Sequence, residues 1–220
     1  MKKVKTCIIT GGMIDQGFAL PFIQKQNFDI ILAADKGLEF CYENQIEPTY
    51  ILGDFDSLSP EILAYYKQHH TAPIREFNPV KDNTDTDIAF DQALALGSKE
   101  IYIIGATGGR LDHFISILQN MKTAWEKKVP AYIVDGNNLI TLPCENEFTI
   151  SREEQFGKYI SFFPLEAEVA SVTLEGFKYP LEHRRLVNTS GGLCVSNEIT
   201  EEYARVAYEG GILIMVQSKD

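Results

Sequence analysis

Two aspartates stand one residue apart in Gly53-Asp54-Phe55-Asp56-Ser57, a segment that follows the short apolar run at residues 49–52. On a loop, two carboxylates at this spacing can both reach one ion, and hard divalent cations prefer carboxylate oxygens. A helix cap is the competing explanation, because Pro60 and Glu61 open a helical pattern. A cap needs only one acidic side chain, so the presence of two aspartates favours metal binding.

Further polar side chains follow other apolar runs of the chain. Ligands of a doubly wound α/β domain bind at the carboxyl ends of the strands, where these side chains would meet. Several carboxylates gathered at one edge repel one another unless a cation relieves the charge, which favours Mg²⁺ over a softer metal. The side chains are Asp35 after residues 29–34, Asp82, Asp85 and Asp87 after residues 74–77, and Arg110, Asp112 and His113 after residues 101–104. For the acids at 82–87, capping of the helix that starts near Thr86 is the alternative.

A glycine-rich turn, Gly105-Ala106-Thr107-Gly108-Gly109-Arg110, joins a predicted strand to a predicted helix. Such a turn lets backbone N–H groups approach an anion, so Thr107, Gly108 and Gly109 are candidates for phosphate binding. The chain has neither G-x-G-x-x-G nor G-x-x-x-x-G-K-[ST], so the usual dinucleotide and P-loop sites are not indicated. Arg110 can pair with phosphate oxygens, and Asp112 either orients it or joins the metal shell. His113 is more often a capping or packing residue than a catalyst.

The elements that position these residues are βα units. Between residues 4 and 135, short apolar runs alternate with longer segments that have apolar residues three and four apart. This pattern predicts an α/β N-terminal domain at residues 1–137, with a mostly parallel, Rossmann-like sheet. The predicted strands are 4–10, 29–34, 49–52, 74–77, 101–104 and 131–134, and the predicted helices are 38–44, 60–68, 86–96 and 111–127.

The texture changes after the turn signal Asp135-Gly136-Asn137-Asn138. Short β-branched and aromatic stretches separated by Gly, Pro and Asn predict an all-β sandwich at residues 138–220. The predicted strands are 138–142, 147–150, 159–164, 170–174, 193–195, 203–208 and 211–217.

Composition narrows the class of partner. With 20 Lys and Arg against 31 Asp and Glu, the 220-residue chain has a formal charge of −11, which disfavours nucleic acid as a partner. Its apolar runs are shorter than the roughly 20 residues that span a bilayer, so no membrane partner is expected. The N-terminus is typical of a first strand rather than a signal peptide, which predicts a cytoplasmic protein. Four widely spaced cysteines indicate neither a zinc site nor a disulfide framework.

Taken together, the motifs resemble the thiamine pyrophosphokinase family over nearly the whole chain. The resemblance rests on five segments: Ala34-Asp35-Lys36-Gly37, Gly53-Asp54-Phe55-Asp56-Ser57, Lys81 to Asp87, Gly105 to His113, and Ser196-Asn197-Glu198. It implies transfer of a diphosphate from ATP to the hydroxyl of thiamine, giving thiamine diphosphate and AMP. It also implies that the N-terminal domain binds ATP and Mg²⁺, that the sandwich binds thiamine, and that the active sites lie at the interface of a homodimer.

The resemblance also implies roles for individual residues. Asp54, Asp56 and Asp82 or Asp85 would hold the metal and the phosphates, with Asp35 nearby. Arg110 and Asp112 would lie at the nucleotide-phosphate end, and Ser196 and Asn197 would reach the aminopyrimidine of thiamine. Tyr179 offers an aromatic face or is an ordinary strand residue.

One residue departs from the pattern of the family, which commonly has glycine where this chain has Lys36. Its side chain stands beside the acidic cluster and either contacts a phosphate or points into solvent. Two other functions compete with the implied one. The first is a diphosphokinase for another alcohol, such as a pterin-type acceptor, and the second is a nucleotide or thiamine-phosphate sensor without turnover.

Overall fold

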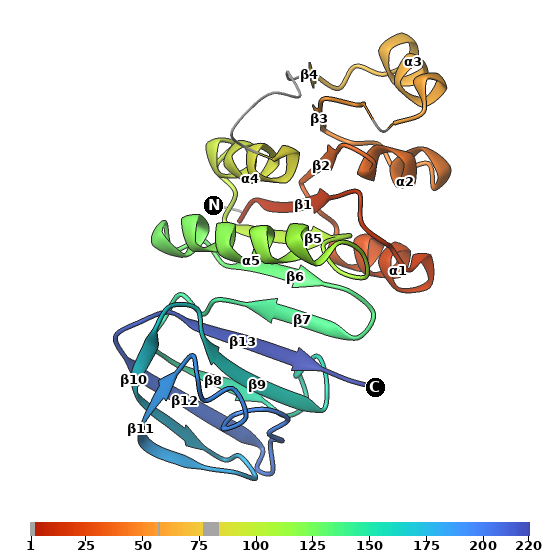
Figure 1. Cartoon of the computed structure of the whole chain (residues 1–220). Coiled ribbons are helices and arrows are strands. Elements are labelled where there is room, and N and C mark those ends of the chain that lie inside the picture. The colour runs from red at the N-terminus through yellow and green to blue at the C-terminus, as the bar shows by residue number, and fades with distance from the viewer. Residues whose placement is uncertain (1–2, 57, 77–83) are drawn as a thin grey trace. The chain divides into compact units, whose positions relative to one another are not determined.

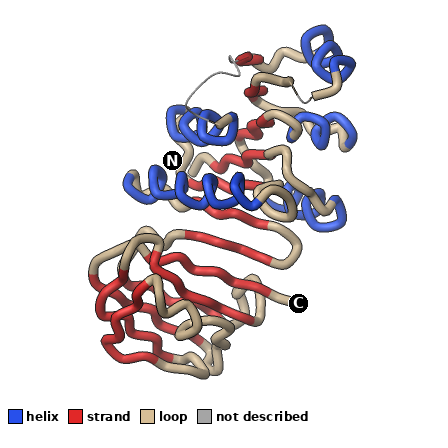
Figure 2. Tube along the Cα trace, viewed as in Figure 1, coloured by secondary structure: helices blue, strands red, loops and turns tan. Residues whose placement is uncertain are grey.

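The computed structural model describes residues 3–56, 58–76 and 84–220, and the chain divides into two compact units (Figure 1). The first unit is Met1–Gly136 and the second is Asn137–Asp220. In the described residues, helices occur in the first unit, whereas the second is built of strands and loops (Figure 2). No helix in the described part of the chain is long and apolar enough to cross a membrane.

The first unit is built around a parallel sheet with the strand order β4-β3-β2-β1-β5-β6. Its described strands are β1 (Lys5–Ile9), β2 (Ile30–Ala34), β3 (Tyr50–Gly53), β4 (Ile74–Glu76), β5 (Glu100–Ile104) and β6 (Ala131–Val134). Its described helices are α1 (Gln16–Gln26), α2 (Gly37–Glu43), α3 (Pro60–His69), α4 (Asp85–Ala95) and α5 (Leu111–Glu126). The predicted mostly parallel sheet is therefore confirmed.

The central strands are apolar nearly throughout, because both faces of a parallel sheet are covered. Ile8, Leu32 and Ile103 are completely buried. The strand order reverses at β1, which pairs with β2 on one side and with β5 on the other. Ligands of open α/β sheets bind beyond the carboxyl ends of the strands at such a reversal, so the loops after β1 and β5 are placed to receive one.

Helix α1 has no counterpart among the elements predicted from the sequence. Gly17 and Pro21 weaken the helical pattern of this segment, and its apolar residues do not form a clean stripe. The signal that would have revealed the helix is Asp15, whose side chain accepts a hydrogen bond from Gly17 N at 2.9 Å as the N-cap. The helix ends at Asn27, which has a left-handed φ of 49°.

The second unit contains two antiparallel sheets, with strand orders β7-β13-β9 and β11-β10-β12-β8. The strands are β7 (Asn138–Thr141), β8 (Glu147–Ser151), β9 (Tyr159–Pro164), β10 (Glu168–Glu175), β11 (Leu181–Val187), β12 (Tyr203–Glu209) and β13 (Leu213–Ser218). Phe162 and Leu213 of the first sheet share one buried core with Val172 and Val206 of the second. Two sheets packed over a common core form the predicted sandwich.

One strand prediction in this unit is wrong, and one strand was missed. Residues 193–195 form a turn instead of a strand. Strand β11 was not predicted because four consecutive residues, Glu182 to Arg185, are polar and exposed, which hides the alternation of a half-buried strand. As the edge strand of its sheet, β11 carries the charges that protect such edges from pairing with other chains.

Candidate functional site

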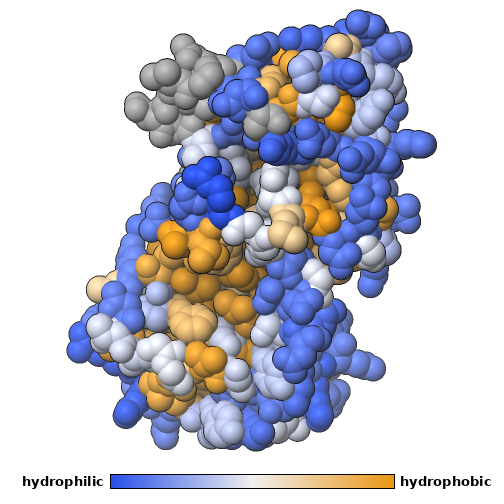
Figure 3. All heavy atoms as spheres, turned by 45° about the vertical axis from the view of Figure 1, so that its right-hand side comes forward, coloured by the Kyte–Doolittle hydropathy of each residue, from blue (hydrophilic) through white to orange (hydrophobic). Residues whose placement is uncertain are grey.

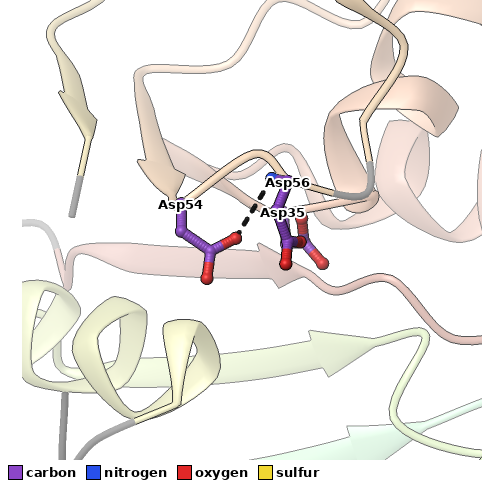
Figure 4. Close-up of side chains that lie close together, drawn as sticks. All are labelled: Asp35, Asp54 and Asp56. Atoms are coloured by element: carbon purple, nitrogen blue, oxygen red, sulfur yellow. Dashed lines mark hydrogen bonds between the residues drawn. The ribbon is translucent and has the colours of Figure 1, made fainter. Parts of the chain in front are cut away.

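Three aspartates meet at the carboxyl edge of the sheet in the first unit. Asp35 follows β2, and Asp54 and Asp56 follow the neighbouring strand β3. One carboxylate oxygen of each lies within 4.8 Å of one oxygen of the other two. In Figure 4 the three carboxylates point to the same side of their loops. Asp35, which was expected only near the metal site, thus lies in the same cluster as Asp54 and Asp56.

The backbone of both loops is shaped to bring these acids together. Asp35 and Phe55 have left-handed φ angles of 50° and 57°, which non-glycine residues rarely adopt. Phe55 is 7% exposed, so its buried ring anchors the middle of the Asp54–Asp56 turn. Asp54 Oδ1 accepts a hydrogen bond from the Asp56 amide at 3.2 Å. A Cβ on Gly53 would lie 3.3 Å from Asp35 Cα, so glycine permits the close approach of the two loops.

The donor set of this cluster fits a hard divalent cation. Every ligand atom offered is a carboxylate oxygen, and no sulfur or imidazole joins the group among the described residues. Three carboxylates this close repel one another, and a doubly charged ion removes that repulsion. Mg²⁺ therefore suits the site better than a soft transition metal.

A cavity of about 720 Å³ joins this cluster to the glycine-rich turn. Its walls come from the loops after β1, β2, β3 and β5 and from the first turns of α4 and α5. The residues that line it include Gly11, Gly12, Asp35, Lys36, Asp54, Asp85, Thr107, Gly109, Arg110 and His113. The cavity thus lies at the strand reversal between β1 and β5, the position expected for a ligand of this fold.

The glycine-rich turn is held from two sides. A Cβ on Gly12 would lie 2.0 Å from the Gly105 carbonyl oxygen, so only glycine lets the loops after β1 and β5 touch. Thr107 Oγ1 donates a hydrogen bond to Asp135 Oδ2 at 2.6 Å. Neither Gly12 nor Asp135 was among the site residues predicted from the sequence. Their signal was the same one that marked the other loops, namely a position in the loop that follows a strand.

Arg110 and Asp112 form an exposed pair at the start of α5. The guanidinium donates to both carboxylate oxygens, at 3.1 and 2.6 Å. Hydrogen bonding to Arg110 lowers the pKa of Asp112 to about 2. Of the two roles left open for Asp112, this geometry matches orientation of Arg110, and Asp112 does not line the cavity.

The acids around residue 85 are divided between two positions. Asp85 lines the cavity at the first turn of α4. Asp87 forms a capping box with Thr84, because its carboxylate accepts from Thr84 N at 2.8 Å while Thr84 Oγ1 accepts from Asp87 N. Asn120 of α5 also donates to Asp87. Asp82 lies outside the described residues.

In the second unit, Asn197 and Tyr179 lie side by side. Asn197 is 2% exposed, and its Oδ1 accepts hydrogen bonds from the backbone N–H groups of Tyr179 and Glu198, each at 3.0 Å. Its Nδ2 donates to the Tyr179 carbonyl at 2.8 Å. Tyr179 is 57% exposed, and Ser196 has a left-handed φ of 56°. Asn197 therefore fixes the backbone on which Tyr179 is presented.

Comparisons with known proteins agree for both units of the chain. Residues 24–133 match the family described as Thiamin pyrophosphokinase, catalytic domain, and residues 145–213 match the one described as Thiamin pyrophosphokinase, vitamin B1 binding domain. Thiamine pyrophosphokinase of Bacillus subtilis is 33% identical over 189 residues, which cover 86% of this chain and 87% of the relative.

Solved structures show the same likeness. A crystal structure of thiamine pyrophosphokinase from Bacillus subtilis superimposes with a TM-score of 0.87 at 30% identity, covering 98% of this chain and 99% of that one. The Geobacillus thermodenitrificans enzyme has a TM-score of 0.83 at 28% identity, covering 98% of each chain. Yeast thiamin pyrophosphokinase, at 18% identity, shares the fold with a TM-score of 0.84 and covers 99% of this chain and 87% of that one. The chain belongs to the thiamine pyrophosphokinase family.

Proposed function

We propose that this chain transfers the terminal diphosphate of ATP to the hydroxyl of thiamine, releasing AMP. The observation that carries the proposal is one cavity walled by a carboxylate cluster and a glycine-rich turn, in a chain whose two halves match the two domains of the family. Such a cavity supplies both a cation site and a phosphate site, which a diphosphate transfer needs together.

In this proposal the first unit aligns the phosphates and neutralises their charge. The glycine-rich turn at Thr107, Gly108 and Gly109 offers backbone N–H groups to phosphate oxygens. Arg110 turns from Asp112 toward a phosphate when the nucleotide binds. Transfer then depends on the alignment of attacking and leaving oxygens, with little covalent help from the protein.

Asp54 and Asp56 are the proposed metal ligands, together with Asp35, which the geometry adds to the set. When bound there, Mg²⁺ would neutralise the charge of the phosphates. Asp85 lines the same cavity and is proposed for the same end of the site. Asp82, predicted beside it, stays a prediction from the sequence.

The proposed thiamine site lies in the second unit. Ser196 and Tyr179 are presented at the surface next to the buried Asn197. The Tyr179 ring is a flat apolar surface suited to stacking on the aminopyrimidine. We assign Asn197 a role in holding this surface, since its amide oxygen already accepts two backbone hydrogen bonds.

We also propose a homodimer whose active sites include residues of both subunits. The support in this chain is apolar exposure beside the cavity: Met13, Leu111 and Ile115 are 72%, 74% and 53% exposed. On the face drawn in Figure 3, apolar side chains lie exposed among hydrophilic ones. Contiguous exposed apolar surface marks association sites in soluble proteins. Light scattering should give twice the chain mass, and a monomer mass would contradict the dimer.

One assay tests the function. The purified protein is incubated with ATP, Mg²⁺ and thiamine, and AMP and thiamine diphosphate are followed together. We expect both products in equal amounts. Release of AMP only with another alcohol would overturn thiamine as the acceptor, and nucleotide binding without AMP release would indicate a sensor.

The cytoplasmic location expected from the sequence stays a prediction, which cell fractionation can check.

A further inference from the structure

Lys36 occupies a position at the cavity that no role has yet explained. It follows Asp35 at the end of β2 and immediately precedes α2. Lys36 is exposed, and it lines the cavity together with Asp35, Thr107 and Arg110. A lysine side chain is long and flexible, so an ammonium group anchored at this rim can reach a ligand inside.

The base of the Lys36 side chain is held in place by neighbouring backbone. A Cβ added to Gly11, in the loop after β1, would lie 2.9 Å from Lys36 Cβ. A Cβ on Gly37, the next residue, would lie 2.0 Å from the Ile9 carbonyl oxygen. The chain at Lys36 and Gly37 thus packs closely against the end of β1 and the loop after it, and the Lys36 Cβ faces Gly11, which lines the same cavity.

The charges around the cavity distinguish Lys36 from Arg110. Within the described residues, these two are the Lys or Arg side chains that line it, facing Asp35, Asp54 and Asp85. Arg110 is already paired with Asp112 through two hydrogen bonds. Lys36 forms no ion pair or hydrogen bond through its ammonium in the described part of the chain. A polyphosphate entering the cavity therefore meets Lys36 as a cation that no carboxylate has engaged.

We propose that Lys36 binds the phosphate chain of the nucleotide, and that Gly11 is required because it leaves room for the Lys36 side chain. The inference rests on the proposed function only in taking a nucleotide as the occupant of the cavity. The contact adds a charge-assisted hydrogen bond on the side of the cavity formed by the loops after β1 and β2.

Direct binding of a nucleotide tests this role without any turnover. Titration calorimetry with α,β-methylene-ATP and Mg²⁺ compares the wild type with Lys36→Met, which keeps most of the unbranched side chain and removes the charge. We expect the Kd to rise about tenfold, the value for loss of one charge-assisted hydrogen bond. Lys36→Arg should restore most of the affinity. Lys25→Met, an exposed lysine of α1, is the matched control and should leave the Kd unchanged.

The variant Gly11→Ala provides a second test of the inference. Its added methyl group would collide with Lys36 Cβ and displace the side chain, so it should weaken nucleotide binding in the wild type and have little further effect on Lys36→Met. An unchanged Kd for Lys36→Met would overturn the inference, as would an equal effect of Gly11→Ala in both backgrounds. If Gly11→Ala fails to fold, the Met and Arg variants decide alone. A protein that binds the nucleotide through Lys36 but never transfers diphosphate to thiamine would contradict the proposed function and leave this inference standing.

Discussion

Two acidic segments of the first unit have the same spacing and different structures. Asp54 and Asp56 stand one residue apart, as do Asp85 and Asp87. In the first segment the intervening Phe55 has a left-handed φ of 57°, and both carboxylates join Asp35. In the second segment both residues lie on α4, where positions two apart point about 200° from each other around the axis. Asp85 consequently lines the cavity while Asp87 caps the helix.

The spacing of acids along the chain therefore does not determine their role. A loop with a left-handed central residue turns alternate side chains to one side, whereas a helix separates them. In the loop, both carboxylates therefore join one cluster with Asp35, whereas on the helix Asp85 lines the cavity and Asp87 caps the helix. Variants of each segment test this distinction.

The largest effect is expected for Asp54→Asn or Asp56→Asn. Each removes ligand charge from the cluster, so kcat/KM should fall by about a hundredfold or more. The melting temperature should stay level or rise, because neighbouring carboxylates repel one another. Asp91→Asn, an exposed acid of α4, is the control. Near-normal turnover of both loop variants would contradict the metal assignment.

Within the second segment, activity and stability should separate. Asp87→Ala removes half of the capping box and the Asn120 contact, which should lower the free energy of unfolding by about 1 kcal/mol in urea titrations. Asp85→Asn should instead reduce turnover with little loss of stability. If Asp87→Ala abolishes activity in a protein that stays folded, the assigned division between ligand and cap is wrong.

A smaller effect is expected at the glycine-rich turn. Thr107→Val keeps the shape of the side chain and removes the donor to Asp135, so the free energy of unfolding should fall by about 1 kcal/mol. The KM for ATP should rise, since the loop that offers N–H groups is less well held. Thr107→Ser retains the hydroxyl and should behave as the wild type. Equal behaviour of the Val and Ser variants would exclude a positioning role for the hydrogen bond.

The smallest effect concerns the exposed Arg110–Asp112 pair. Arg110 lowers the pKa of Asp112 to about 2. The pair therefore stabilises the folded state at pH values above the pKa that Asp112 has in the unfolded chain, and this stabilisation is lost as the pH falls through about 2. Arg110→Gln should raise the pKa of Asp112 toward its ordinary value of 3.8, which NMR titration measures. Because the pair is exposed, stability near neutral pH should change little. An unchanged Asp112 titration would show that the pair does not form in solution.

Much of the fold followed from periodicity. The helices predicted at residues 38–44, 60–68, 86–96 and 111–127 agree with α2 to α5 to within one residue at each end. Helix α1 was not predicted because Gly17 and Pro21 obscure its helical pattern. Strand β11 was not predicted because polar and apolar residues do not alternate along it. Both misses arise where local composition departs from the pattern that tertiary packing imposes.

The loops of the candidate site could be predicted from the sequence, because residues that follow parallel strands lie at one edge of the sheet. These loops carry Asp35, Asp54, Asp56 and the glycine-rich turn. Which side chains meet depends on the tertiary structure: Asp35 joins the cluster, Asp87 becomes a cap, and Asp135 accepts a hydrogen bond from Thr107. These outcomes depend on backbone angles and on contacts between residues distant in the sequence, such as Gly12 with Gly105 and Gly11 with Lys36. The spacing of residues along the chain does not predict them.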